Sequence, residues 1–206
     1  MQNLIDEVEL LKNSEISEVV TNRINEFKKI KKGSSDELFK ELCYCILTAG
    51  FSAEKCIKIH KEIGDGFLTY SEEELAKKLK KLGYRFPNRA KYIPKALESK
   101  EQLKKNIQSF KGDDLRKFIV NDIDGIGYKE ASHFLRNIGF DDFAIIDYHI
   151  VDTLTKYNLI EKPKTMTRKK YLEIEKVLKQ IAQKSNLTLA ELDLYLWYME
   201  TSKILK

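Results

Sequence analysis

The chain has 206 residues, which is enough for one large domain or two small ones around a genuine hydrophobic core. Hydrophobic residues make up 42% and charged residues 33% of a composition with only three prolines, which is typical of a globular protein. No run of 18 apolar residues is present and the first residues are rich in acids, so we expect neither a membrane-spanning helix nor a secretion signal, and a cytoplasmic protein.

The charge balance and the cysteines narrow the function classes only slightly. Lysine and arginine exceed aspartate and glutamate by 37 to 32, which suits a polyanionic partner but is common among ordinary proteins. Cys43, Cys45 and Cys56 are too few and too clustered for a disulfide framework, and the first two do not share a face of a helix. We interpret them as packing residues and expect no structural metal, no iron–sulfur cluster and no cofactor.

Apolar residues recur every three or four positions along most of the chain, and no segment alternates as a strand would, so the sequence predicts an all-α fold. Ser71 and Gly83 bound a segment that carries every helix signal: a serine cap, an acidic first turn, a basic last turn and a terminal glycine. Pro94 is expected to bend or shorten its helix. Helices are predicted over 4–30, 37–50, 53–64, 71–83, 87–99, 112–123, 128–137, 147–160, 168–186 and 188–206.

The segment "NDIDGIGYKEASHFLRN" places Gly125 and Gly127 between two of these helices. Glycines here are consistent with a tight structural turn. They are also consistent with a nucleic-acid backbone site, because they expose consecutive N–H groups at a helix N-terminus, where the dipole favours a phosphate. Lys129 lies in the first turn of the second helix, where the same dipole disfavours a cation.

These residues resemble a known family. "IDGIGYKEASHFLRN" is similar to the hairpin of the helix-hairpin-helix DNA glycosylases, and "GIGYKEASHFLRNIGFDDFAIIDYHI" more narrowly resembles the archaeal-type, second family of 8-oxoguanine DNA glycosylases. The likeness continues through "CILTAGFSAEKC", "GYRFPNRAKYI", "KYLEIEKVL" and "LDLYLWYMETSKILK" and so touches nearly the whole chain in order. It implies a single domain over 1–206, with two helical lobes flanking a base pocket and the hairpin at about 113–138. It also implies excision of oxidised guanine followed by strand cleavage.

The resemblance assigns the catalytic pair to Lys129 and Asp147. Attack on a sugar carbon needs a neutral amine, whereas the pKa of a free lysine is near 10.4. A helix N-terminus and partial burial are both expected to lower that pKa, which would make the placement of Lys129 intelligible. Asp147 is expected to cap the helix that follows it and to hold a negative charge beside the reacting sugar. The simpler alternatives are a phosphate-contacting Lys129 and an Asp147 that only caps a helix.

The resemblance also implies contacts to the base and to the backbone. Trp197 is expected near the base, the carboxylate of Lys206 as a hydrogen-bond acceptor, and Phe86 as a weaker stacking candidate. A core role remains open for Trp197, which has helical spacing with Leu194. The expected DNA-backbone contacts are Gly125, Gly127, Arg85, Arg89 and Arg136.

Four positions depart from the family pattern and put affinity and substrate preference in question: Gly50, Asp124, Tyr148 and Ser202. The expected partner is double-stranded DNA containing oxidised guanine, bound by a monomer that associates with the nucleoid while on DNA. Two alternatives stay open. One is a glycosylase of the same superfamily that acts on another lesion. The other is a non-catalytic hairpin module, which would need the glycines but have no use for Lys129 and Asp147.

Overall fold

The computed structural model describes residues 1–206 and contains helices but no strand. The helices of the first half are α1 Gln2–Lys12, α2 Ile16–Lys31, α3 Ser35–Thr48, α4 Ala53–Ile63, α5 Gly66–Thr69 and α6 Glu72–Lys81. They are followed by a 3₁₀ helix Pro87–Lys91, then α7 Tyr92–Glu98, α8 Lys100–Ser109 and α9 Gly112–Asp122. The chain ends with α10 Tyr128–Asn137, α11 Tyr148–Lys156, α12 Arg168–Lys184 and α13 Leu189–Thr201. No helix is long and apolar enough to cross a membrane.

The all-α prediction is confirmed, and the differences lie at element boundaries. The apolar pattern expected as one helix over 4–30 is broken, because residues 13–15 form a turn that separates α1 from α2. The Ser14 hydroxyl donates to the Leu11 carbonyl and accepts the Ile16 N–H there, so a side chain competes with the helix ladder. The predicted helix 87–99 is a 3₁₀ turn followed by α7, and Pro94 falls in the first turn of α7, where its missing N–H costs nothing. Helices α5 and α8 were not predicted.

Several helices begin where the sequence supplies a reciprocal cap. Ser34 accepts the backbone N–H of Glu37 while the Glu37 carboxylate accepts the backbone N–H of Ser34, and the same capping box recurs at residues 71 and 74 and at 188 and 191. Each box satisfies two N–H groups that a helix start leaves without partners. The local sequence therefore determines where α3, α6 and α13 begin.

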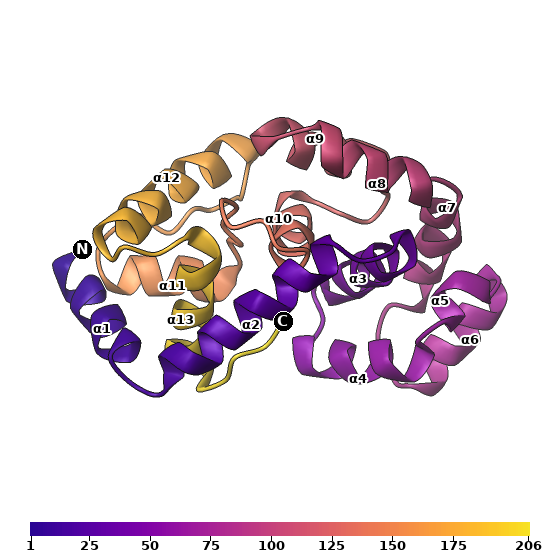
Figure 1. Cartoon of the computed structure of the whole chain (residues 1–206), viewed down its shortest axis with the longest axis horizontal. Helices are drawn as coiled ribbons and strands as arrows, with labels where there is room; N and C mark the ends of the chain where they lie inside the picture. Colours follow the sequence, from indigo (N-terminus) through magenta and orange to yellow (C-terminus); the bar gives the residue numbers. More distant parts are fainter.

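The helices form two groups (Figure 1), and each group encloses a hydrophobic core of its own. One is built mainly from α3 to α10, and its largest buried side chains include Tyr44, Phe39 and Phe134. The other combines the two ends of the chain, because α1 and α2 pack with α11, α12 and α13. Helix α2 crosses the middle of the molecule between the two groups of helices, and it contacts both α13 and the hairpin helix α10.

A buried ion pair joins the two cores. Arg116 of α9 is 2% exposed and binds Glu175 of α12 through two hydrogen bonds of 2.7 and 2.9 Å. The guanidinium also donates to Asp113 and to the hydroxyl of Ser132 on α10. A fork-shaped pair of this kind fixes both the distance and the relative orientation of its helices. Helix α12 is thereby held against the α9–α10 hairpin.

Gly139 ends α10 at a point where two backbones nearly touch. Its φ is +86°, and a Cβ built on it would lie 2.8 Å from the Lys28 Cα and 2.9 Å from the Phe27 carbonyl oxygen. Gly83 has a similar φ of +72° but nothing within 4 Å of the corresponding position. Substitution of Gly83 therefore measures the cost of backbone strain alone, whereas substitution of Gly139 adds the cost of a steric clash.

We predict that Gly83→Ala destabilises the protein by about 1 kcal/mol, because alanine is strained at positive φ. Gly139→Ala should cost about 3 kcal/mol, because the methyl group also forces α10 away from α2. Urea unfolding of both variants measures the difference. Equal losses for the two variants would show that α2 and α10 do not need this close approach.

Candidate active site

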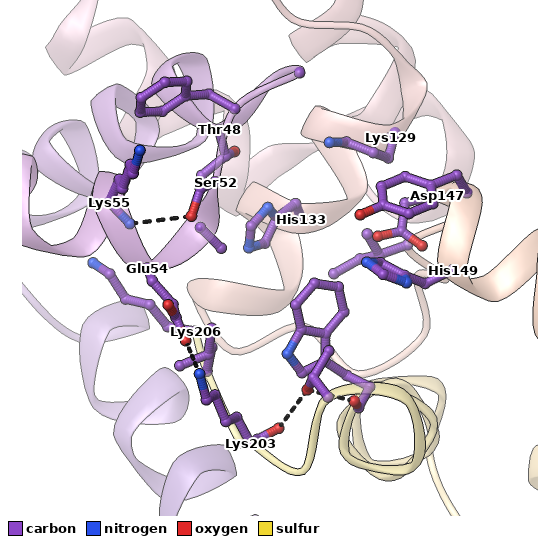
Figure 2. A pocket seen from close by; sticks show the side chains of 18 of the residues that line it. Thr48, Ser52, Glu54, Lys55, Lys129, His133, Asp147, His149, Lys203 and Lys206 are labelled. Atoms are coloured by element: carbon purple, nitrogen blue, oxygen red, sulfur yellow. Dashed lines mark hydrogen bonds and ion pairs between the residues drawn. The ribbon is translucent and has the colours of Figure 1, made fainter. Parts of the chain in front are cut away.

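A cavity of about 860 Å³ opens where the two cores meet. Its walls come from the α3–α4 connection, from α10, from the start of α11, from α13 and from residues 203–206. Figure 2 shows Ser52 and Lys55 on one side of this cavity and Lys129, Asp147 and His149 on the other. Side chains that are far apart in the sequence therefore face one space.

Lys129 occupies the first turn of α10, and its side chain lines the cavity with 26% exposure. Its ammonium lies 3.1 Å from Oε1 of Glu130, while the other oxygen of Glu130 accepts the backbone N–H of Gly127 at 3.2 Å. Glu130 thus caps the helix and neutralises Lys129 at the same time. This contact offsets the unfavourable placement of a cation at the positive end of α10.

Asp147 is the N-cap of α11, and its Oδ1 accepts the backbone N–H of Ile150 at 3.0 Å. The buried segment that precedes it is held by α12. The Tyr171 hydroxyl donates to the Ala144 carbonyl at 2.7 Å and accepts the Ile146 N–H at 3.2 Å. Because Tyr171 is buried and lies on α12, the Arg116–Glu175 pair that locates α12 also locates Asp147.

An ion pair lies at the wall between α10 and α13. Arg136 donates to Oδ2 of Asp193 at 2.8 Å, and both side chains are largely buried. Burial nevertheless raises the pKa of Asp193 to about 6, with Asp147 adding to the rise and Arg136 opposing it. The cost of removing this carboxylate from water therefore exceeds the benefit of the ion pair.

His133 lies one turn beyond Lys129 and is 8% exposed. Burial lowers its pKa well below the usual value, and the nearby charges of Arg136 and Lys129 lower it further, so the ring is neutral. Its Nε2 atom is buried without a partner inside the protein. A neutral imidazole that faces the cavity and has an unpaired nitrogen is free to hydrogen-bond a ligand.

Trp197 and Lys206 both line the cavity. Trp197 is partly buried, and its Nε1–H has no partner within the protein. Lys206 is held by its ammonium, which lies 2.8 Å from Oε2 of the buried Glu41 and 4.2 Å from the ring centre of Tyr44. The Tyr44 hydroxyl donates to the Lys206 oxygen at 2.9 Å. The final segment is thus fixed against α3.

Only some of the other residues predicted to contact DNA line the cavity. Arg85 is exposed and lines the cavity, whereas Phe86 and Arg89 are partly buried and do not line it. Arg89 donates to the Ile46 carbonyl at 2.8 Å. Gly125 and Gly127 are exposed beyond the cavity lining. Arg136 differs from the prediction: it is 4% exposed and bound to Asp193, so its burial argues against a surface contact with phosphate.

Two residues of the site were not predicted from the sequence. Asp193 precedes Trp197 by four residues on α13, so the helical spacing already places both on one face. Glu41 carried no such signal, because its partners Asn137 and Lys206 are distant in the sequence. Only the folded chain brings them together.

Comparison with known proteins shows which sequences this chain resembles. The sequence model of a family described as 8-oxoguanine DNA glycosylase matches residues 20–187. A protein of Methanocaldococcus jannaschii named 8-oxoguanine DNA glycosylase/AP lyase is 56% identical, with 98% of this chain and 99% of the relative covered. A relative of the same name from Korarchaeum cryptofilum is 49% identical over 100% of this chain and 99% of its own length.

Solved structures show the same similarity. The M. jannaschii 8-oxoguanine glycosylase/lyase in complex with a 15mer DNA containing 8-oxoguanine superimposes with a TM-score of 0.95 at 56% identity, covering 98% of this chain and 99% of that one. The 8-oxoguanine DNA glycosylase of Thermotoga maritima superimposes with a TM-score of 0.94 at 39% identity, covering 100% of this chain and 99% of that one.

The raised pKa of Asp193 predicts a pH-dependent stability. An aspartate whose pKa is higher in the folded state favours folding at low pH, and this contribution is lost as pH rises from the ordinary value near 3.8 through 6. The unfolding free energy of the wild type relative to Asp193→Asn should therefore fall by about 2 kcal/mol between pH 4.5 and 7.5. Urea unfolding of both proteins at the two pH values measures this; a difference that does not change with pH would contradict the raised pKa.

Proposed function

The chain belongs to the 8-oxoguanine DNA glycosylase family, and on that premise we propose that it excises 8-oxoguanine from double-stranded DNA and then cleaves the strand at the abasic site. The observation that carries the proposal is the placement of Lys129 and Asp147 on one wall of a single cavity. A lysine and a carboxylate facing a cavity this large are the groups that this chemistry requires. The chain acts as a single domain, because both cores contribute to the walls of the one site.

The reaction begins with extrusion of the damaged nucleotide, because its glycosidic carbon cannot be reached inside the duplex. Lys129 must lose its proton before it can attack, since only the neutral amine has a free electron pair. Its nitrogen then bonds to C1′ while the bond between C1′ and the base breaks, and the base leaves with that electron pair and takes up a proton. Opening of the sugar ring at its oxygen converts the product into a Schiff base with Lys129.

The Schiff base permits strand cleavage. Loss of a proton from C2′ supplies electrons that the iminium group accepts, and the bond between C3′ and the phosphate oxygen breaks. Hydrolysis of the imine afterwards releases Lys129. No oxidation or reduction occurs at any step, and water, consumed when the imine is hydrolysed, is the only co-reactant.

Asp147 supports the first of these steps. Its carboxylate is oriented by the Ile150 N–H, and it is positioned to stabilise the positive charge that develops on the sugar as the base leaves. It can also accept the proton of Lys129, which lines the same wall. Because the helix cap fixes its rotamer, Asp147 needs no rearrangement to act.

The base and the duplex are held by different parts of the site. Trp197 and Lys206 lie inside the cavity and contact the extruded base, whereas Arg85 lies exposed at its rim near the backbone. One chain supplies all of these residues, which supports action as a monomer. The relatives come from archaea and bacteria, whose DNA lies in the cytoplasm, which supports action in that compartment.

Lys129→Gln should abolish the covalent adduct that forms when borohydride is added to a mixture of the protein and a duplex with one 8-oxoguanine. Glutamine retains a polar side chain of similar reach but cannot form a Schiff base. Lys55→Gln, which changes another lysine lining the cavity, is the matched control and should keep the adduct. Denaturing gel electrophoresis detects the product. An adduct that survives in Lys129→Gln would assign the nucleophile elsewhere; wild-type binding without base release would indicate a non-catalytic hairpin module.

Asp147→Asn should leave the protein folded, because asparagine caps helices as well as aspartate does. Loss of the charge should slow base release by about 10²–10⁴-fold, the usual range for removing an acid–base group. Single-turnover rates with saturating enzyme isolate this step from DNA binding. A rate within a few-fold of the wild type would reduce Asp147 to a helix cap.

A further inference from the structure

Tyr148 is an exposed aromatic side chain at the rim of the cavity. It lines the cavity and yet remains 69% exposed, the second highest exposure among the exposed large hydrophobic side chains. A residue that both lines a cavity and faces solvent lies at its mouth. A large ring at such a place is accessible to any ligand that enters the cavity.

The backbone explains why Tyr148 points outward. Asp147 caps α11 with extended backbone angles, and Tyr148 is the first residue of the helix that follows. The next residue, His149, is partly buried and lies in the cavity wall, so an exposed ring and a more buried ring occupy adjacent positions of the first turn. The same cap that orients the Asp147 carboxylate therefore presents the Tyr148 ring to the mouth of the site.

Three rings form a continuous series from the rim into the cavity. The ring of Tyr148 lies 3.9 Å from that of His149 at an angle of 35°, and His149 meets Trp197 edge to face at 5.0 Å. His149 thus supports one face of Tyr148 and restricts its motion, while most of the ring remains open. A rigid, half-supported aromatic face is well suited to stacking against another flat ring.

The charges at the mouth indicate what the ring meets. Helix α11 contributes Tyr148 and His149 to the cavity lining but no lysine or arginine, whereas the opposite side carries Arg85, Lys55 and the Glu54–Lys203 ion pair. Figure 2 shows Lys55 across the cavity from Asp147 and His149. The rim at the start of α11 therefore offers an aromatic ring and contributes no cation of its own.

We propose that Tyr148 stacks on the nucleobase next to the extruded nucleotide. This inference rests on the proposed function, because extrusion of one base leaves its neighbour without a stacking partner on one side. An aromatic ring at the mouth replaces that partner without reading the identity of the base. Tyr148 is a DNA-binding residue that acts through its ring and takes no part in the bond-breaking steps.

The test uses a duplex in which a tetrahydrofuran abasic analogue, which cannot react, is flanked by the fluorescent base 2-aminopurine. Tyr148→Ala should bind this duplex about tenfold more weakly than the wild type, equal to about 1.4 kcal/mol and within the range for one stacked base. Its complex should also be brighter, because the reporter base loses its quenching ring. The slope of affinity against salt concentration should not change, since no phosphate contact is removed.

Two further variants decide between explanations. Tyr148→Phe should match the wild type in affinity and fluorescence; if it is as weak as Tyr148→Ala, the phenol hydroxyl makes the contact and stacking is excluded. Phe110→Ala is the matched control. Phe110 is an exposed aromatic residue too, with 41% exposure, and it is stacked on a neighbouring ring but lies outside this cavity. It should leave binding unchanged.

The same protein samples are assayed for excision of 8-oxoguanine, so that the two proposals can fail separately. Wild-type protein that excises the lesion, together with a Tyr148→Ala variant that binds as tightly as the wild type, would overturn the stacking role alone. Wild-type protein that binds the 8-oxoguanine duplex but releases no base would overturn the proposed function. The fluorescence of the 2-aminopurine duplex would still report whether Tyr148 stacks.

Discussion

The buried contact between Arg116 and Glu175 is the constraint on which the arrangement of the site depends. Its two hydrogen bonds connect α9 in one core to α12 in the other. Glu175 also accepts the Ala144 N–H, so the segment leading to Asp147 is attached at the same point. Loss of either partner would leave an uncompensated buried charge, at a cost of about 3–5 kcal/mol. Stability and the placement of the proposed catalytic carboxylate therefore depend on one interaction.

Each of the two proposed catalytic groups is positioned by a contact that also stabilises a helix. Asp147 caps α11, and Glu130 caps α10 while it pairs with Lys129. Asp193 is less favourably placed: burial raises its pKa, so its ionisation is unfavourable even beside Arg136. A pocket that must exclude water from a reacting sugar also withdraws water from its own charged residues, and the raised pKa of Asp193 is a consequence of that design.

Local signals allowed most helices to be predicted from the sequence, because capping boxes such as Ser71 with Glu74 act over three residues. The turn at residues 13–15 was missed, since the apolar period continues across it and only the Ser14 hydroxyl interrupts the ladder. In the site, the hairpin and Lys129 were recognisable from their motif. The burial of Arg136 was not, because it depends on Asp193, which lies 57 positions further along the chain. Long-range partners of this kind leave no periodic trace in a sequence.

If the cavity binds a base as proposed, its unpaired polar atoms provide a way to distinguish one base from another. Nε2 of His133 and Nε1 of Trp197 are buried without protein partners, although a group left in this state costs about 1–3 kcal/mol. A base whose edge satisfies both atoms recovers that energy, whereas a base that satisfies neither leaves the cost in place. Because burial keeps His133 neutral, its ring can accept a hydrogen bond from the base or, in the other tautomer, donate one. Selectivity in such a pocket arises mainly from the penalty imposed on the wrong base.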